Sequence, residues 1–233
     1  GLGDTIRVSL TEEPEAEIPV AKKLVSVCAV ADEGGVCSRF RSPVAYARRK
    51  THAAGPIGGS QVPVVLATLK PAGSEGPPPD FYVVDEPGAG TVPSPGARII
   101  MPARYAMARP GGNEVFPLFS GEEILDFPVL PAPMNFLHLG MGTMPEPVAT
   151  YLKGRTNVVI IADMGARTAF SLCRQFFLWL DKKGITAPVI LKAAFDGQDR
   201  ETFQIGAAVH LGSLLADGLG DGLWLEAAAH PRA

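Results

Sequence analysis

The feature that most constrains the fold is a series of short apolar runs that recurs through most of the chain. Runs such as FYVVD, ARIIMPA and VVIIAD are bounded by turn-forming residues and have the length of strands. Fully apolar strands of this kind are typical of parallel strands buried on both faces. About eight parallel strands favour a (β/α)8-type barrel, and an open doubly wound α/β sheet is the alternative. The runs lie at residues 62–69, 81–85, 97–103, 115–119, 134–142, 156–163, 187–195 and 218–227.

Helical sequence is confined mostly to the second half of the barrel. The 26 glycines and 22 prolines concentrate between residues 55 and 147, where they break helices and form turns. Further along, residues 168–183 have helical periodicity and end at Gly184, and residues 199–211 form a second helix capped by Asp199. We therefore predict a barrel whose outer helical ring is incomplete in its first half.

The first ten residues of the chain resemble the sequence of its last predicted strand. The chain begins GLGDTIRVSL, and GLGDGLWLEA follows 217 residues later (218 minus 1), which is close to the length of one barrel. Residues 5–10 alternate as a strand does, and a helix with acidic residues in its first turn follows. Duplication is favoured over coincidence because the strand pattern repeats with the glycines. The repeat then marks the closing strands of two successive barrels.

Charge and cysteine content exclude several classes of protein. A net charge of −3 with no dense basic cluster argues against a nucleic-acid partner, and the run Arg48-Arg49-Lys50 is interpreted as a solvated patch. No apolar run is long enough to cross a membrane, and no signal peptide is recognised. Cys28 and Cys37 lack CxxC spacing, and Cys173 lies on the apolar face of a helix. These features predict a cytoplasmic protein without a membrane partner.

Three segments carry a resemblance to a known family. The stretch GLGDTIRVSLTEEPEAEIPVAKKLV resembles the end of the catalytic barrel of the 4-hydroxy-3-methylbut-2-enyl diphosphate synthases. RRKTHAAGPIGGSQVPVV and LLADGLGDGLWLEA resemble the insert domain in the three-domain form of these enzymes, found in plastids and Bacteroidetes-like bacteria. The resemblance implies that residues 1–27 are the last strand and helix of the catalytic barrel, 28–47 a linker and 48–227 an insert barrel. Residues 228–233 would then begin a linker to an absent iron–sulfur domain.

The resemblance also implies an activity for the intact enzyme. Members of this family reductively open 2-C-methylerythritol 2,4-cyclodiphosphate with electrons from ferredoxin or flavodoxin, delivered through a [4Fe-4S] cluster. The cluster cysteines belong to the absent domain, and the three cysteines here do not match their pattern. The segment is therefore expected to be a structural spacer, inactive alone and without metal ligands or catalytic residues. Arg7 and Ser9 are the predicted substrate-binding residues, because a guanidinium and a hydroxyl suit a diphosphate; an interstrand salt bridge is the alternative for Arg7.

Two other functions stay open from the residues alone. An independent small barrel enzyme or metabolite-binding module would use Asp163, Lys192 and Asp196 at the carboxyl ends of strands. A docking surface for the electron donor is a third hypothesis, weakened by the negative net charge. The remaining polar residues are interpreted structurally: turn stabilisers, an N-cap or turn residue, a satisfied core histidine and a buried polar anchor. They are, in that order, Asp4 and Asp221, Asp163, His138, and Glu226.

Overall fold

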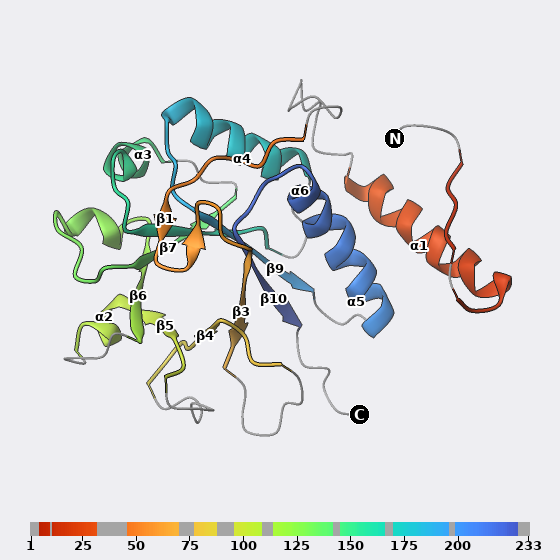
Figure 1. Cartoon of the computed structure of the whole chain (residues 1–233), viewed down its shortest axis with the longest axis horizontal. Coiled ribbons are helices and arrows are strands. Elements are labelled where there is room, and N and C mark those ends of the chain that lie inside the picture. The colour runs from red at the N-terminus through yellow and green to blue at the C-terminus, as the bar shows by residue number, and fades with distance from the viewer. Residues whose placement is uncertain are drawn as a thin grey trace.

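The chain folds around a closed barrel of eight parallel strands, shown in the computed structural model of Figure 1. The order around the barrel is β10-β3-β4-β5-β6-β7-β8-β9, so the first and last strands pair and no edge is left. The predicted barrel is confirmed, and the open sheet is not formed. The structure describes residues 5–9, 11–31, 46–69, 77–87, 96–108, 114–141, 145–165, 170–195 and 199–227.

Each predicted apolar run coincides with one barrel strand, and β6 extends one residue past its run. The strands are β3 (Val64–Thr68), β4 (Phe81–Val83), β5 (Ile99–Pro102), β6 (Val115–Ser120), β7 (Asn135–Gly140), β8 (Val158–Asp163), β9 (Val189–Phe195) and β10 (Gly222–Ala227). A two-stranded antiparallel hairpin, β1 (Ala53–Ala54) with β2 (Ile57–Gly58), precedes them. One face of each strand points into the barrel, and the outer faces of the strands in the second half lie beneath helices, whereas the outward Val65 of β3 is 51% exposed.

The helices are unevenly distributed, as the glycine and proline content predicts. Among the described residues, the first half of the barrel carries only single turns of helix, and the second half carries longer ones. Gly184 ends α4 with a φ of +67°, and the Asp199 carboxylate accepts the Thr202 N–H at the start of α5. The helices are α1 (Pro14–Ala31), α2 (Ala103–Ala106), η2 (Glu123–Asp126), α3 (Glu146–Leu152), α4 (Phe170–Lys183), α5 (Arg200–Ala207), η3 (Ala208–Gly212) and α6 (Ser213–Ala216).

Large side chains fill the interior of the barrel. Phe81, Phe116 and Phe136 meet edge to face, with ring centroids 5.8–6.2 Å apart. Ile57 of the hairpin belongs to the same cluster and closes the amino-terminal end of the barrel. Each fully buried phenylalanine contributes about 1.5–3 kcal/mol by leaving water. The interior is thus a packed core rather than a channel.

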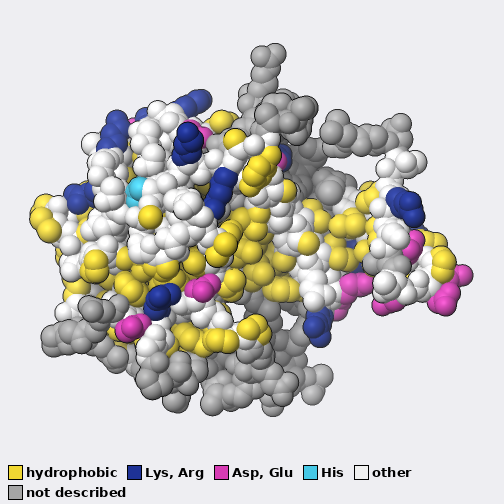
Figure 2. All heavy atoms as spheres, in the orientation of Figure 1, with side chains coloured by type: hydrophobic (Ala, Val, Ile, Leu, Met, Phe, Trp, Pro, Cys, Tyr) yellow, Lys and Arg dark blue, Asp and Glu magenta, His cyan; other side chains and the backbone are white. Residues whose placement is uncertain are grey.

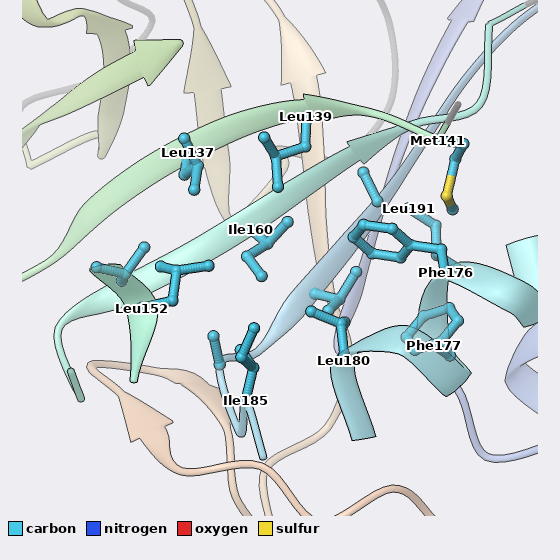
Figure 3. Close-up of a cluster of buried hydrophobic side chains, with 14 of the residues drawn as sticks. Leu137, Leu139, Met141, Leu152, Ile160, Phe176, Phe177, Leu180, Ile185 and Leu191 are labelled. Carbon is cyan, nitrogen blue, oxygen red and sulfur yellow. The ribbon is translucent and has the colours of Figure 1, made fainter. Parts of the chain in front are cut away.

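A second core lies between the outer face of the sheet and helix α4. Phe176, Phe177 and Leu180 pack on strand residues that include Leu139 and Ile160 (Figure 3). Cys173 belongs to this cluster and is fully buried on the apolar face of α4, as predicted, with a free thiol. The side chain of Cys28 and all of Cys37 lie outside the described residues. In the part of the chain that the structure describes, no helix combines the length and apolar character needed to cross a membrane.

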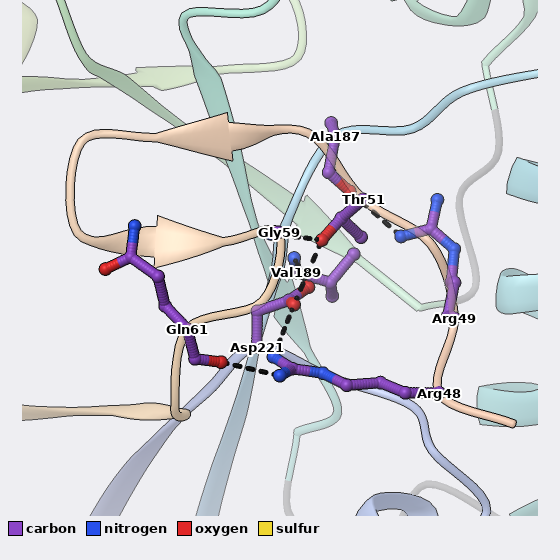
Figure 4. Close-up of polar contacts among 8 residues, drawn as sticks. All are labelled: Arg48, Arg49, Thr51, Gly59, Gln61, Ala187, Val189 and Asp221. Atoms are coloured by element: carbon purple, nitrogen blue, oxygen red, sulfur yellow. Dashed lines mark hydrogen bonds and ion pairs between the residues drawn. The ribbon is translucent and has the colours of Figure 1, made fainter.

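The interpretation of the basic run as a solvated patch is wrong for two of its three residues. The Arg49 side chain is only 4% exposed; it donates to the carbonyls of Ile185 and Ala187 and pairs with Asp181. Arg48 pairs with Asp221, at 3.0 Å (Figure 4). Charged groups can be buried here because backbone carbonyls and carboxylates satisfy them. Through these contacts, the two arginines bind the segment before β1 to the amino-terminal end of the barrel.

The second GLGD motif is a structural turn into the closing strand. Gly218 has a φ of +77°, and a Cβ there would lie 2.8 Å from the Ala47 carbonyl oxygen, so only glycine fits. The Asp221 carboxylate accepts the Val189 N–H at 3.0 Å and is buried. Asp221 accepts a backbone N–H, as predicted, but that of Val189 on β9 rather than one of its own turn, and it thereby joins β9 to the arginine-containing segment. Asp4, in the first motif, lies outside the described residues.

The strand predicted over residues 5–10 is not formed in its described part, residues 5–9. Residues 5–9 have no regular secondary structure, although the predicted helix after them is present as α1. A strand needs a neighbour to accept its backbone hydrogen bonds, and the closed barrel offers no free edge. Helix α1 continues to Ala31, past the predicted start of the linker at residue 28. Residues 32–45 and 228–233 of the predicted linkers lie outside the described residues.

Candidate functional site

A group of polar side chains lies where the barrel interior opens at the carboxyl ends of its strands. On β8 and β9, Ile161 and Ile190 face the interior core, so Asp163 and Lys192, two positions further on, face the same way. By the same alternation, β7, β10 and β3 contribute further polar residues above the last apolar layer. These residues are His138, Glu226 and Thr68. Five strands that are consecutive around the closed barrel therefore meet in one polar layer.

Asp163 lies at the centre of one half of this layer. Its Oδ2 is 2.9 Å from His138 Nε2 and 3.1 Å from Lys192 Nζ, while its Oδ1 accepts the Gly165 N–H at 2.8 Å. Burial alone raises the pKa of the Asp163 carboxyl. The hydrogen bonds from His138, the backbone and Lys192 outweigh burial and hold that pKa well below its usual range. Asp163 is therefore an ionised acceptor, and it is not poised as a general acid.

Lys192 connects Asp163 to the other half of the layer. Its ammonium lies 3.5 Å from Glu226 Oε2 and 4.3 Å from the centroid of the Trp224 ring. The Thr68 hydroxyl donates to Glu226 at 2.9 Å, and the Trp224 indole N–H donates to the Thr68 oxygen at 3.2 Å. Because β10 and β3 are the last and first strands of the barrel, these bonds cross the seam where it closes. An ammonium placed over an indole face is also stabilised by cation–π attraction.

The layer is largely satisfied by its own members. Lys192 is 16% exposed and has two carboxylate partners, and each of those carboxylates has a second donor. The ammonium has three N–H donors, and its two carboxylate partners leave little of that capacity for a ligand. Among the described residues, no set of three histidines, cysteines or acidic residues has the arrangement of a metal site. The internal pairing closes the mouth of the barrel. A polar ligand that bound here would replace hydrogen bonds that these side chains now make with one another.

The structure brings together some of the predicted site residues and corrects others. Asp163 and Lys192 meet, as the barrel hypothesis requires, whereas Asp196 lies outside the described residues. The core interpretation of His138 is wrong: its side chain is 37% exposed, because it stands beyond the last apolar layer, although Asp163 does satisfy it. Asp163 also fulfils its predicted turn role through Gly165. Glu226 is a partly buried polar anchor, as predicted.

Two members of the layer, Thr68 and Trp224, were missed by sequence reasoning. Both stand at interior-facing positions of strands whose apolar runs were recognised, so strict alternation from Leu66 and Gly222 would have placed them inward. Their contact with each other needs the closure of β10 onto β3, which is separated from it by most of the chain.

The predicted substrate-binding residues lie apart from this layer. Arg7 and Ser9 are exposed on the irregular segment before α1. Counted from the first glycine of each motif, Arg7 corresponds to Trp224 and Ser9 to Glu226. Trp224 and Glu226 face the interior near the barrel mouth. Arg7 and Ser9 would have the same orientation if residues 5–10 formed the closing strand of another barrel.

Comparison with known proteins identifies relatives over nearly the whole chain. No protein-family model matches it. Proteins named 4-hydroxy-3-methylbut-2-en-1-yl diphosphate synthase (flavodoxin) match 97% of the chain, with 34% identity for that of Phocaeicola vulgatus and 31% for that of Parabacteroides distasonis. The chain spans only 37% and 38% of the lengths of these two proteins. A chloroplastic protein of Oryza sativa, named as the ferredoxin form of this synthase, is 45% identical over 56 residues, which are 24% of this chain and 8% of the rice protein.

Proposed function

We propose that this chain serves one of the 4-hydroxy-3-methylbut-2-en-1-yl diphosphate synthases as a structural spacer. The premise is its homology to one segment of these enzymes. The proposed spacer barrel is residues 48–227, and residues 1–27 are proposed to be the last strand and helix of the catalytic barrel. The observation that carries the proposal is that the match covers 97% of this chain but only 36–38% of the first four relatives. The activity then belongs to a protein of which this chain is one part.

The packing of the barrel supports a mechanical role. Its interior is filled by aromatic and aliphatic side chains, and the polar layer at its mouth pairs internally. The chain reaches the barrel at the amino-terminal end, where Arg48 and Arg49 are anchored, and leaves β10 at the opposite end (Figure 1). A rigid body with attachments at opposite ends holds its two neighbours a fixed distance apart, as a spacer requires.

The proposed reaction of the intact enzyme is the reductive ring opening of the cyclic diphosphate. The relatives' names support flavodoxin as the electron donor, with ferredoxin as the donor in the plastid form. The expected [4Fe-4S] cluster does not fit the described residues of this chain. Burial raises the pKa of the Cys173 thiol to about 12, and that thiol is enclosed by the outer core, whereas cluster ligands are thiolates. We assign the cluster to another part of the enzyme and no reaction step to this barrel.

Arg7 and Ser9 are the residues of this chain that we propose to contact substrate. Their correspondence to Trp224 and Glu226 supports an inward orientation in the catalytic barrel. A guanidinium can donate two parallel hydrogen bonds to a phosphate group. In the full-length enzyme, Arg7→Ala is expected to weaken substrate binding or turnover by about a hundredfold, which is about 2.7 kcal/mol of charged hydrogen bonding.

The spacer proposal is tested by neutralising the mouth of the barrel in the full-length synthase. Lys192→Met with Glu226→Gln removes the ion pair and keeps similar side-chain volumes. A spacer predicts kcat/KM within about twofold of wild type, because no substrate contact is lost. Arg7→Ala, measured beside it, is the sensitive control. A large fall in kcat for the mouth variant, with an unchanged circular dichroism spectrum, would assign a chemical role to this barrel and refute the proposal.

The position of the polar layer favours one second candidate function, the binding of a small polar metabolite. Ligand sites of (β/α)8 barrels lie at the carboxyl ends of the strands, where Asp163 and Lys192 meet. Calorimetric titration of a metabolite library against this chain tests it. Binding with a Kd in the micromolar range that is lost in Lys192→Met would establish this function.

A further inference from the structure

Helix α1 has two different faces. Ile18 and Val25 are seven residues apart, so they lie on one side of the helix, and they are 56% and 53% exposed. At about 100° per residue, Val20 and Lys23 point to the opposite side. That side is half-buried where α1 packs against α5 and η3. Figure 2 shows hydrophobic side chains on the surface of α1 beside its acidic residues.

The docked face is held by charge. Lys23 forms an ion pair with Glu201 and lies 4.0 Å from Asp199, and both acidic residues stand at the start of α5. The hydrogen bond to Glu201 raises the pKa of the Lys23 ammonium, so it stays charged. Asp199 also caps α5 through Thr202, which fixes its carboxylate in place. The position of α1 along α5 is therefore set by one lysine that pairs with Glu201 and lies beside the anchored carboxylate of Asp199.

The same contact includes an unusual stretch of helix. Residues Ala208–Gly212 form η3, a π-helical turn between α5 and α6, and α1 packs against it. Single π turns inside α-helices are rare and frequent at functional positions. A widened turn at the place where another helix docks is consistent with an interface that this fold maintains.

The exposed face of α1 lacks a counterpart within the described residues. Residues 5–9 before the helix alternate like a strand, yet the closed barrel has no edge for them, and Ile6 is 49% exposed. A strand sequence followed by a helix with an uncovered apolar face is a βα unit whose own sheet is elsewhere. The relatives are long enough to supply that sheet, since this chain spans 36–38% of their length.

We infer that α1 is a bridging helix, which covers a preceding sheet with its Ile18–Val25 face and docks on α5 and η3 with its Lys23 face. The angle between the preceding catalytic barrel and the spacer barrel is then fixed by the Lys23 contact. This inference rests on the proposed membership of a longer synthase, and it adds the surface through which the two barrels are joined.

The docked face is tested in the 233-residue chain by hydrogen exchange. Lys23→Glu and Glu201→Lys are each expected to speed exchange of the α1 amides by about fivefold to tenfold, through loss of the pair and new repulsion. The double variant re-forms the pair in reverse, although the carboxylate at position 23 then faces Asp199, so it should recover most but not all of the lost protection. Lys22→Glu makes the same charge change on an exposed neighbour and should have no effect. Equal exchange in all variants would overturn the docked face.

The exposed face is tested by comparing the chain with the full-length synthase. Ile18→Ser with Val25→Ser should leave the melting temperature of the 233-residue chain unchanged and lower that of the full-length enzyme by several degrees. Val129→Ser, at an exposed valine of the barrel, is the control and should change neither. No effect in the full-length enzyme would overturn the inference. A concentration-dependent dimer of the chain that this variant abolishes would also overturn it, by making a second copy the occupant.

These outcomes separate the inference from the spacer proposal. Loss of activity in the mouth variant refutes the spacer but leaves the exchange results on Lys23 and Glu201 intact. Unchanged exchange and melting refute the bridging helix but leave an active mouth variant consistent with a spacer.

Discussion

Replacing Arg49 by alanine should destabilise the barrel strongly, although the residue belongs to what looks in sequence like a surface run. The guanidinium is 4% exposed; it donates to the buried carbonyls of Ile185 and Ala187 and to Asp181. A hydrogen bond from a charged group contributes about 1.5–3 kcal/mol, and the Asp181 pair adds little because that carboxylate is 42% exposed. Two such bonds give an expected loss of about 3–6 kcal/mol, close to the ~3–5 kcal/mol that breaking a buried ion pair costs.

Equilibrium unfolding in urea, followed by tryptophan fluorescence, measures this loss. The midpoint should fall while the slope of the free energy with urea stays constant, since the native surface is nearly unchanged. Lys50→Ala is the matched control, because Lys50 is the exposed neighbour in the same run, and it should change stability by less than about 0.5 kcal/mol. Arg49→Lys should recover only part of the loss, since an ammonium cannot reach both carbonyls in fork geometry. An Arg49→Ala protein within about 1 kcal/mol of wild type would refute the reasoning.

Three further predictions follow from the polar contacts and the outer core. Asp163→Asn should lower the free energy of unfolding at pH 7, and the difference from wild type should shrink as pH falls below about 4. The reason is that folding lowers the pKa of the Asp163 carboxyl, so its contribution to stability is lost when it is protonated. Unfolding measured at pH 7 and pH 3 tests this. Cys173, whose pKa burial raises to about 12, should resist a thiol reagent at pH 8 until the chain unfolds, in a variant whose other two cysteines are alanine. Asp221→Asn should cost about 1–3 kcal/mol by thermal unfolding, since an amide cannot accept from both Arg48 and the Val189 N–H as the carboxylate does.

The strands could be predicted because their signal is local. An apolar run flanked by turn residues contains its own evidence of burial, and all eight runs became strands. The burial of Arg49 could not be predicted in this way. Its partners Asp181, Ile185 and Ala187 lie more than 130 positions away in sequence and reach it only after the barrel closes. A basic run next to a linker has the same local pattern whether it is solvated or enclosed.

The prediction over residues 5–10 failed for a related reason. Alternation describes what a segment would do beside a sheet edge, and the closed barrel has none to offer. At the mouth of the barrel, the pairing of Asp163 with Lys192 was accessible because their strands are consecutive in sequence. The bond between Thr68 and Glu226 was not, since it joins the first and last strands across the seam.

The repeat gives a physical reason why two similar barrels would differ in chemistry. At the two interior positions of the closing strand, the first motif has Arg7 and Ser9, and the second has Trp224 and Glu226. In the barrel described here, the Trp224 indole ring packs in the interior and makes a cation–π contact with the Lys192 ammonium. The Glu226 carboxylate forms an ion pair with the same ammonium. A diphosphate entering this mouth would meet a carboxylate where the first motif has a hydroxyl, and it would have to displace an ion pair to reach a cation. Under the proposed function, these two positions would account for an anion-binding mouth in the catalytic barrel, whereas the mouth of the present barrel is paired internally.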